Sequence, residues 1–210
     1  MDGLLFDIDG TLVDSTPVVE RVWRTWAARH RLDAEAILRD SHGRRSVDTI
    51  AQFLPADEVA AALAEHEELE LHDLDDVIAL PATGPLLSRL PADRWAAVTS
   101  GSRTLMQARL RQAGLPVPDV LISADDVTVG KPDPQGYLMA AHALGFEPGR
   151  CLVIEDAPAG IAAGLAAGAH VLAVATSHPA SALTAAETVV PDLRACTVDV
   201  GDGIVVVTDG

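Results

Sequence analysis

The chain has 210 residues, of which 49% are hydrophobic and 22% charged, and its formal net charge is −16. This composition is typical of a globular protein with room for one sizeable core and a second small module. The acidic balance argues against nucleic-acid binding, because no surplus of lysine and arginine is present to neutralise phosphates. It does not exclude a small anionic substrate, since a local cation cluster or a metal ion can reverse the sign of charge inside one pocket.

Two features indicate where the protein works. Its two cysteines, Cys151 and Cys196, are too few for a disulfide framework, so free thiols in a reducing compartment are expected. The N-terminus lacks the basic and apolar regions of a signal peptide, and no apolar stretch reaches the roughly 18 residues of a membrane span. We therefore expect a cytoplasmic protein without membrane partners, as a monomer or a small homo-oligomer.

Short apolar runs bounded by turn residues predict strands that are buried on both faces of a parallel sheet. Helical patterns separate these runs, with glycine after the last turn or proline in the first. The expected strands cover residues 3–6, 95–99, 120–122, 151–154 and 170–174, and the expected helices cover 102–113, 134–144 (opened by Asp133-Pro134) and 158–168. Strands alternating with helices of this length predict an α/β fold with a doubly wound parallel, Rossmann-like sheet.

The alternation is interrupted between residues 15 and 82. This stretch, called here the helical insert, shows helical periodicity without a convincing strand, and the sheet is expected to resume near residues 81–87. We predict a core of residues 1–14 and 83–210 and an all-helical second domain of residues 15–82. The acidic run 65–76 is expected to be a solvated helix face, and residues 197–210 a terminal β-hairpin.

Chemically active side chains follow several expected strands. In an open parallel sheet, ligands bind outside the carboxyl ends of the strands. Asp7 and Asp9 follow the first strand, Ser100-Gly101 the second and Glu155-Asp156 a later one, while one lysine, Lys131, precedes a helix. Carboxylates suit a divalent metal, and N–H groups with an ammonium suit phosphoryl oxygens, so the set indicates phosphate chemistry.

Four segments, FDIDGTLVDS, VTSGSR, VGKPDP and VIEDAPAGI, occur in this order and resemble the four motifs of the haloacid dehalogenase superfamily. The insert lies where some members carry a helical cap, and the resemblance covers essentially the whole chain. HGRRSVDTI, TSGSR and IEDAPAGIAAG are most similar to the glycerol-phosphate and 2-deoxyglucose-6-phosphate phosphatase branch. The resemblance implies a Mg²⁺-dependent phosphatase that acts on a small phosphorylated sugar or polyol.

The resemblance also implies roles for the acids. Asp7 would attack phosphorus and form an aspartyl-phosphate. Asp9 would protonate the leaving alkoxide and then activate the hydrolytic water. Mg²⁺ would be held by Asp7, the backbone carbonyl of Asp9 and Asp156, with Glu155 acting through water or behind the ligands.

Cations and hydroxyls complete the implied site. Ser100, with Thr99 as the neighbouring alternative, and the amide of Gly101 would hold phosphoryl oxygens. Lys131 would neutralise the phosphorylated nucleophile. The basic segment His42, Gly43, Arg44 and Arg45 is either an exposed turn or a loop that reaches over the pocket and selects an anionic substrate.

Three other functions remain at this stage. A sugar phosphomutase would share the intermediate, but related mutases use a cap histidine and an arginine or lysine where Val19 and Ser46 stand here. A haloacid dehalogenase needs no acid in the position of Asp9. A phospho-accepting signalling receiver combines similar groups, but it lacks an inserted cap and phosphorylates an aspartate at the end of a middle strand.

Overall fold

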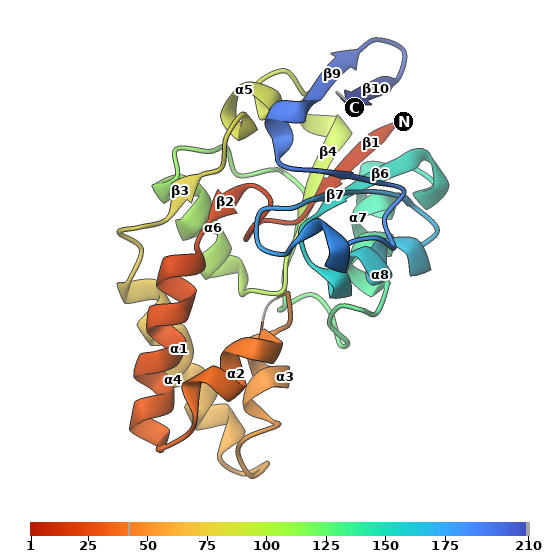
Figure 1. Cartoon of the computed structure of the whole chain (residues 1–210). Helices are drawn as coiled ribbons and strands as arrows, with labels where there is room; N and C mark the ends of the chain where they lie inside the picture. The colour runs from red at the N-terminus through yellow and green to blue at the C-terminus, as the bar shows by residue number, and fades with distance from the viewer. Residues whose placement is uncertain (42, 209–210) are drawn as a thin grey trace.

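A six-stranded parallel sheet forms the centre of the larger part of the molecule (Figure 1). This computed structural model describes residues 1–41 and 43–208. The strand order is β5-β4-β1-β6-β7-β8, with all neighbours parallel. The strands are β1 (Gly3–Phe6), β4 (Trp95–Val98), β5 (Leu121–Ile122), β6 (Cys151–Glu155), β7 (His170–Val174) and β8 (Thr188–Val190). The predicted α/β fold is confirmed, and β8 is an edge strand that the apolar runs did not reveal.

Helices cover both faces of this sheet. Because successive side chains of a strand point to opposite faces, Leu5 packs with α7 and α8, whereas Leu4 and Phe6 pack with α5 and α6. Burial on both faces explains why the strands read as continuous apolar runs. The helices of the core are α5 (Thr83–Leu87), α6 (Arg103–Gln112), α7 (Gln135–Leu144) and α8 (Pro158–Ala166).

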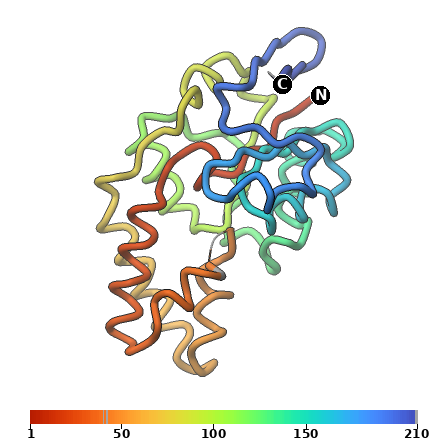
Figure 2. Tube along the Cα trace, in the orientation of Figure 1, coloured from red at the N-terminus to blue at the C-terminus, as the bar shows by residue number. Residues whose placement is uncertain are grey.

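The helical insert forms a separate layer below one end of the sheet, coloured red-orange to yellow in Figure 2. It has its own apolar centre, in which Trp23 and Trp26 pack edge to face with centroids 5.5 Å apart. A short ribbon, β2 (Val13–Asp14) paired with β3 (Ile78–Ala79), joins the insert to the core. The helices of the insert are α1 (Thr16–His30), α2 (Ala34–Ser41), α3 (Ser46–Ile50) and α4 (Val59–His72).

Three local predictions were wrong. The sheet does not resume at residues 81–87, where α5 forms instead and packs Leu86 and Leu87 against the sheet. Pro85 is tolerated there because it lies in the first helical turn, where its missing N–H costs nothing. Helix α7 begins at Gln135, one residue later than expected, and Asp133 accepts a hydrogen bond from its backbone N–H. The acidic run is not wholly solvated, because Glu70 on α4 is only 6% exposed.

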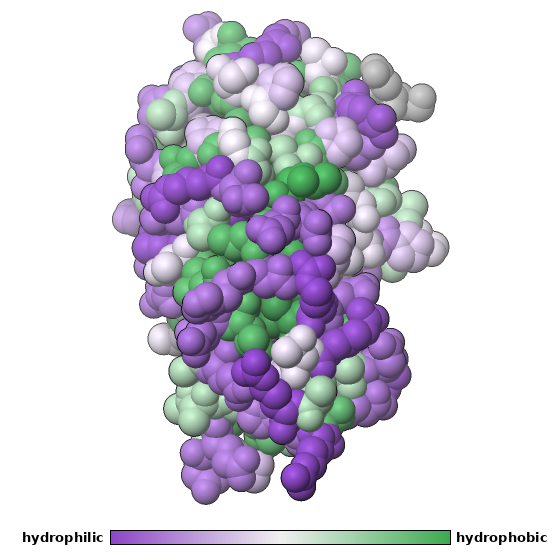
Figure 3. All heavy atoms as spheres, turned by 90° about the vertical axis from the view of Figure 1, so that its left-hand side faces the viewer, coloured by the Kyte–Doolittle hydropathy of each residue, from purple (hydrophilic) through white to green (hydrophobic). Residues whose placement is uncertain are grey.

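The chain ends in an antiparallel hairpin of β9 (Cys196–Val200) and β10 (Ile204–Thr208), as predicted. The N-terminal ammonium donates a hydrogen bond to the carbonyl of Ile204, so the N-terminus lies beside this hairpin. The face with α1, α4 and β3 is mostly hydrophilic, with green apolar areas between the polar side chains (Figure 3). No helix in the described part of the chain has the length and hydropathy needed to span a bilayer.

Candidate active site

Three carboxylates meet at the carboxyl edge of the sheet. Strands β1 and β6 are neighbours in parallel register, with Phe6 opposite Ile154, so the residues that follow each strand lie together. Asp7, Glu155 and Asp156 are all buried, and one oxygen of each lies within 4.8 Å of the others. The predicted convergence of these acids is therefore present in the fold.

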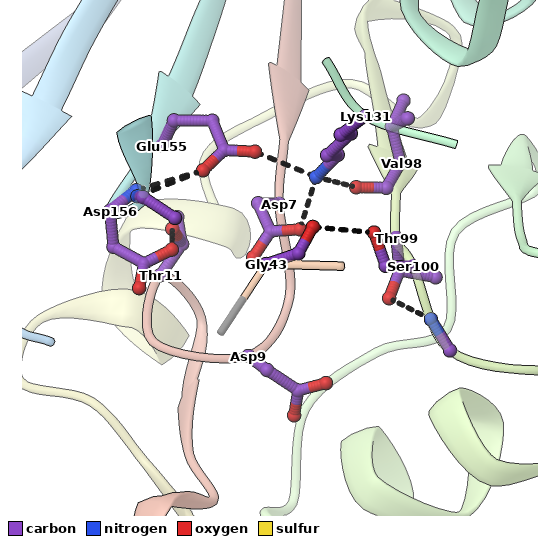
Figure 4. Close-up of polar contacts among 12 residues, drawn as sticks. Asp7, Asp9, Thr11, Gly43, Val98, Thr99, Ser100, Lys131, Glu155 and Asp156 are labelled. Carbon is purple, nitrogen blue, oxygen red and sulfur yellow. Dashed lines mark hydrogen bonds and ion pairs between the residues drawn. The ribbon is translucent and has the colours of Figure 1, made fainter. Parts of the chain in front are cut away.

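Lys131 lies between two of these acids (Figure 4). Its ammonium is 2.5 Å from Oδ1 of Asp7 and 2.6 Å from Oε1 of Glu155, and it also donates to the carbonyl of Val98 at 3.1 Å. Burial would lower the pKa of Lys131, but the two carboxylates outweigh it and raise the pKa above its ordinary value. The lysine is therefore a permanent cation beside Asp7.

Glu155 has partners on both carboxylate oxygens. Oε1 accepts a hydrogen bond from the Tyr137 hydroxyl at 2.8 Å in addition to the lysine. Oε2 accepts from the backbone N–H groups of Asp156 and Ala157 at 3.0 and 3.2 Å. These contacts fix Glu155 as the group that orients Lys131.

Asp156 and Lys131 lie on opposite sides of Asp7 (Figure 4). Its carboxylate accepts hydrogen bonds from the hydroxyls of Thr11, at 3.3 Å, and Ser177. Burial, followed by repulsion from Glu155, raises the pKa of Asp156 to about 7. Burial also raises the pKa of Asp7 well above its ordinary value, and Lys131 only partly offsets this effect. Carboxylates with such pKa values gain free energy when a cation is placed between them.

Asp9 has different surroundings from Asp7, although only Ile8, which is fully buried, separates them. Oδ1 of Asp9 accepts a hydrogen bond from Ser15 at 2.7 Å, and Oδ2 lies 2.8 Å from the Arg109 guanidinium. The two acids therefore share a cavity wall but contact separate groups.

The residues predicted to bind phosphate contact the helical insert and one another. The Ser100 hydroxyl donates to the carbonyl of Gly43 at 2.9 Å, and the Gly101 amide donates to the Thr99 hydroxyl at 3.1 Å. Ser102 caps α6, as expected from its position before the helix. Thr99, Ser100 and Gly101 all line the cavity with Asp7.

The basic segment of the insert divides between two positions. Arg44 is exposed and lines the cavity. Arg45 instead pairs with Asp48 at 2.7 Å and donates to the carbonyls of Val127 and Thr128 in the core, both at 3.3 Å. His42 was predicted to belong to the same loop and lies outside the described residues.

The cavity lies between the core and the insert and opens to solvent. Its core wall carries the acids and the residues of the β4–α6 loop. Its insert wall carries Ser15, Thr16, Val19, Trp23, Ser41, Gly43, Arg44, Ser46 and Glu70. An alcohol of several carbons attached to a phosphate fits a space lined in this way.

Several polar residues of the site escaped the sequence analysis, and three of them left a signal that could have been found. Arg109 sits on the apolar stripe of α6, one turn after Leu105, and an arginine at such a position is a detectable signal. Glu70 likewise lies on the buried face of its helix, α4, one turn after His66. Ser177 follows β7, so the rule that ligands bind beyond strand ends applies to it as well.

The comparisons with known proteins agree with this geometry. The family model for haloacid dehalogenase-like hydrolases matches residues 1–168. The chain belongs to the haloacid dehalogenase-like hydrolase family. The resemblance indicated by the four motifs is confirmed, and the receiver-type signalling function is set aside.

Similar proteins of this family are phosphatases. The hexitol phosphatase A of Escherichia coli is 43% identical over 201 residues, which cover 93% of each chain. Glycerol-1-phosphate phosphohydrolase 2 of Saccharomyces cerevisiae is 36% identical, covering 84% of this chain and 76% of that protein. The crystal structure of a hydrolase from Pseudomonas syringae is 26% identical and superposes with a TM-score of 0.83, covering 91% of this chain and 94% of that one. The expected phosphatase branch is thus the one to which this hydrolase is similar.

Proposed function

We propose that this hydrolase is a Mg²⁺-dependent phosphomonoesterase that acts on a small polyol or sugar phosphate through an aspartyl-phosphate. One observation carries the proposal: Asp7 lines the cavity, with Lys131 against one oxygen and Asp156 nearby. A nucleophilic carboxylate beside a fixed cation and a metal-binding acid is suited to phosphoryl transfer. The similarity to a hexitol phosphatase supports the polyol phosphate class.

The acids present fit a magnesium ion. Mg²⁺ prefers oxygen ligands and takes few protein carboxylates, keeping several waters. Asp7 and Asp156, with the backbone carbonyl of Asp9, would hold it, and Glu155 would contribute mainly by orienting Lys131. Bound there, the ion would neutralise charge on the transferring phosphoryl group.

Asp7 performs the first chemical step. A carboxylate oxygen attacks phosphorus, the bond from phosphorus to the alkoxide oxygen breaks, and an aspartyl-phosphate forms. Lys131 neutralises the negative charge that the phosphorylated Asp7 carries. Ser100 and the Gly101 amide, on the same cavity wall, would bind the phosphoryl oxygens.

Asp9 moves the protons. An alkoxide is a poor leaving group, so the carboxyl of Asp9 donates a proton to its oxygen as the ester bond breaks. The resulting carboxylate then removes a proton from the water that attacks the aspartyl-phosphate. Water hydrolyses the intermediate, and inorganic phosphate leaves with Asp7 restored.

The helical insert would act as a cap that selects the substrate. We propose residues 15–82 as the cap and residues 1–14 and 83–210 as the catalytic core. Arg44 faces the cavity from the insert, where a cation attracts a dianionic phosphate into an acidic protein. The substrate would be a small phosphorylated metabolite, and the enzyme would act in the cytoplasm as a monomer or a small homo-oligomer, without a nucleic-acid or membrane partner.

A phosphomutase is the second candidate, because it shares the phosphorylated intermediate. Val19 and Ser46 both line the cavity from the insert. Neither side chain carries the charge or the imidazole with which related mutases restrain hydrolysis. The residues at positions 19 and 46 therefore favour transfer of the phosphoryl group to water over transfer to a sugar.

The test is phosphate release from a panel of polyol and sugar phosphates in Mg²⁺ buffer. Asp7→Asn should abolish release while the melting temperature stays near that of the wild type, and Asp57→Asn on the exposed surface of the insert serves as control. EDTA should stop the wild type, and added Mg²⁺ should restore it. Activity that survives both Asp7→Asn and EDTA would refute the mechanism, and an isomeric sugar phosphate as product instead of inorganic phosphate would establish the mutase.

A further inference from the structure

Arg109 is a cation on the buried face of α6. Its side chain is only 2% exposed and lies on the same stripe as Leu105 and Leu110. A guanidinium at this depth is retained only where carboxylates offset its loss of hydration. Nη1 lies 2.8 Å from Oδ2 of Asp9, and Nη2 lies 2.9 Å from Oε1 of Glu70. Arg109 thus has one partner in the core and one on the helical insert.

Asp9 is connected to both ends of the insert. Its Oδ1 accepts a hydrogen bond from Ser15, which directly precedes α1. Its Oδ2 pairs with Arg109, whose other partner, Glu70, lies in the last turn of α4 before the chain returns to the core. A displacement of the insert therefore reaches Asp9 through either contact.

Glu70 is itself held by the core of the insert. Its Oε2 lies 3.2 Å from Nδ1 of His66, a residue 1% exposed whose ring centroid is 3.9 Å from that of Trp23. Burial would raise the pKa of Glu70, but His66 and Arg109 outweigh it and lower the pKa. Glu70 is therefore a fixed carboxylate that moves with α4.

We propose that Arg109 is a positioning residue that makes the orientation of Asp9 depend on the docking of α4, with Glu70 as the contact through which the insert acts. The inference rests on the proposed function, in which Asp9 transfers the protons. With α4 docked, Arg109 is shared between two carboxylates and offers one nitrogen to Asp9. When α4 moves away, both forks of the guanidinium turn to Asp9 in a bidentate pair, which holds its carboxyl away from the leaving-group oxygen.

A purely structural ion pair and a positioning pair predict different kinetics. Loss of a structural pair lowers stability and affects every substrate alike. Loss of positioning affects only steps in which Asp9 transfers a proton. Release of an alkoxide from a polyol phosphate needs that proton, whereas 4-nitrophenolate is a stable anion that leaves without it.

The experiment measures single-turnover alcohol release, with enzyme in excess over glycerol 1-phosphate or 4-nitrophenyl phosphate in Mg²⁺ buffer. Glu70→Gln keeps the shape of the side chain and removes its charge. Glu67→Gln is the matched control, because Glu67 is one turn earlier on α4 and lies beside Asp125, not Arg109. Arg109→Lys keeps the charge but loses the fork.

We expect Glu70→Gln to slow glycerol release at least tenfold, which is part of the factor of about 10²–10⁴ that general acid catalysis contributes in full. Nitrophenolate release should stay within about twofold, and Glu67→Gln should change neither rate by more than about twofold. Arg109→Lys should show the same selective loss, and the double variant should be no slower than the slower single variant.

Equal losses on both substrates, or unchanged rates in Glu70→Gln, overturn the positioning role. Melting temperatures accompany each variant, and Glu70→Asp, which draws the carboxylate back from Arg109, gives the same comparison if Glu70→Gln does not fold. A wild type that hydrolyses neither these two esters nor any member of the polyol and sugar phosphate panel refutes the proposed function itself. An active wild type with equal losses in the variants refutes only the role of Arg109.

Discussion

The ammonium nitrogen of Lys131 lies 2.5 Å from Oδ1 of Asp7, although 124 positions separate the two residues. Lys131 is the only lysine of the chain. It pairs with both the proposed nucleophile and Glu155 in a buried site. An unpaired charge there would be strongly destabilising.

Replacing the lysine should remove most of the activity. Lys131→Met should lower kcat on the order of 100- to 1,000-fold, because the charge on the phosphorylated Asp7 is no longer neutralised. Lys131→Arg should not rescue it, since the side chain is 6% exposed and the larger guanidinium does not fit the same contacts. Steady-state phosphate release measures both, and an active Arg variant would contradict the assigned role.

Magnesium affinity should rise with pH. The pKa of Asp156 is raised to about 7 by burial and by Glu155, so the metal-free folded protein binds an extra proton between about pH 4 and 7. Mg²⁺ must displace this proton, so its Kd should fall as the pH rises towards 7 and level off above about 8. For the same reason, the free energy of unfolding of the metal-free protein should decrease as the pH rises from about 4 to 7.

Titration calorimetry at several pH values, with constant ionic strength, measures this dependence. Thermal melts with and without Mg²⁺ should show a stabilisation by the metal that increases from pH 5.5 to 7.5. Asp156→Asn removes the titrating group and should abolish most of both effects. A Kd that is independent of pH in the wild type would contradict the assignment of Asp156 as a ligand.

Gly160 should be intolerant of alanine. A Cβ at this position of α8 would overlap the carboxylate of Glu155, so the glutamate and the lysine that it orients would have to move. Gly160→Ala should therefore reduce kcat by at least about tenfold, although alanine in a helix normally stabilises by up to about 1 kcal/mol. Ala162→Gly, at an exposed position of the same helix, is the control and should cost about 0.5–1 kcal/mol of stability without loss of activity.

The two arginines of the insert loop should respond differently to alanine. Arg44→Ala should raise KM for the phosphorylated substrate about tenfold at an unchanged melting temperature, because one cation leaves the cavity wall. Arg45→Ala should lower the melting temperature, by about 2–4 °C for each kcal/mol of unfolding free energy that is lost. The substitution removes the hydrogen bond to the Val127 carbonyl, which connects the insert to the core, and the ion pair with Asp48. Identical effects of the two substitutions would contradict this division.

The core of the site could be predicted because its signals are local. A buried strand that runs directly into Asp7, and another that runs into Glu155 and Asp156, place these acids at one edge once the strands are parallel. Burial on both faces makes each strand a continuous apolar run. In the helical insert, apolar residues instead recur with the spacing of a helix. Fold class, insert and acidic cluster followed from these patterns.

Where the patterns were weak, only the tertiary structure decided. The apolar pattern of residues 81–87 is compatible with a strand or a helix. Packing of Leu86 and Leu87 against the sheet selects the helix α5. Arg44 and Arg45 are the same residue type at adjacent positions, so the sequence cannot distinguish their roles. Only the docking of the loop against residues 127–128 directs Arg45 to the core carbonyls and leaves Arg44 at the cavity.

The sequence by itself determined which carboxylates meet, because strand ends and chain alternation are properties of neighbouring residues. It could not assign partners to Arg109, whose contacts Asp9 and Glu70 come from distant segments brought together by the packing of the insert on the core. Ion pairs between distant segments depend on burial and on the relative placement of whole elements, and neither leaves a local pattern. The link between the insert and Asp9 is therefore a property of the tertiary structure alone.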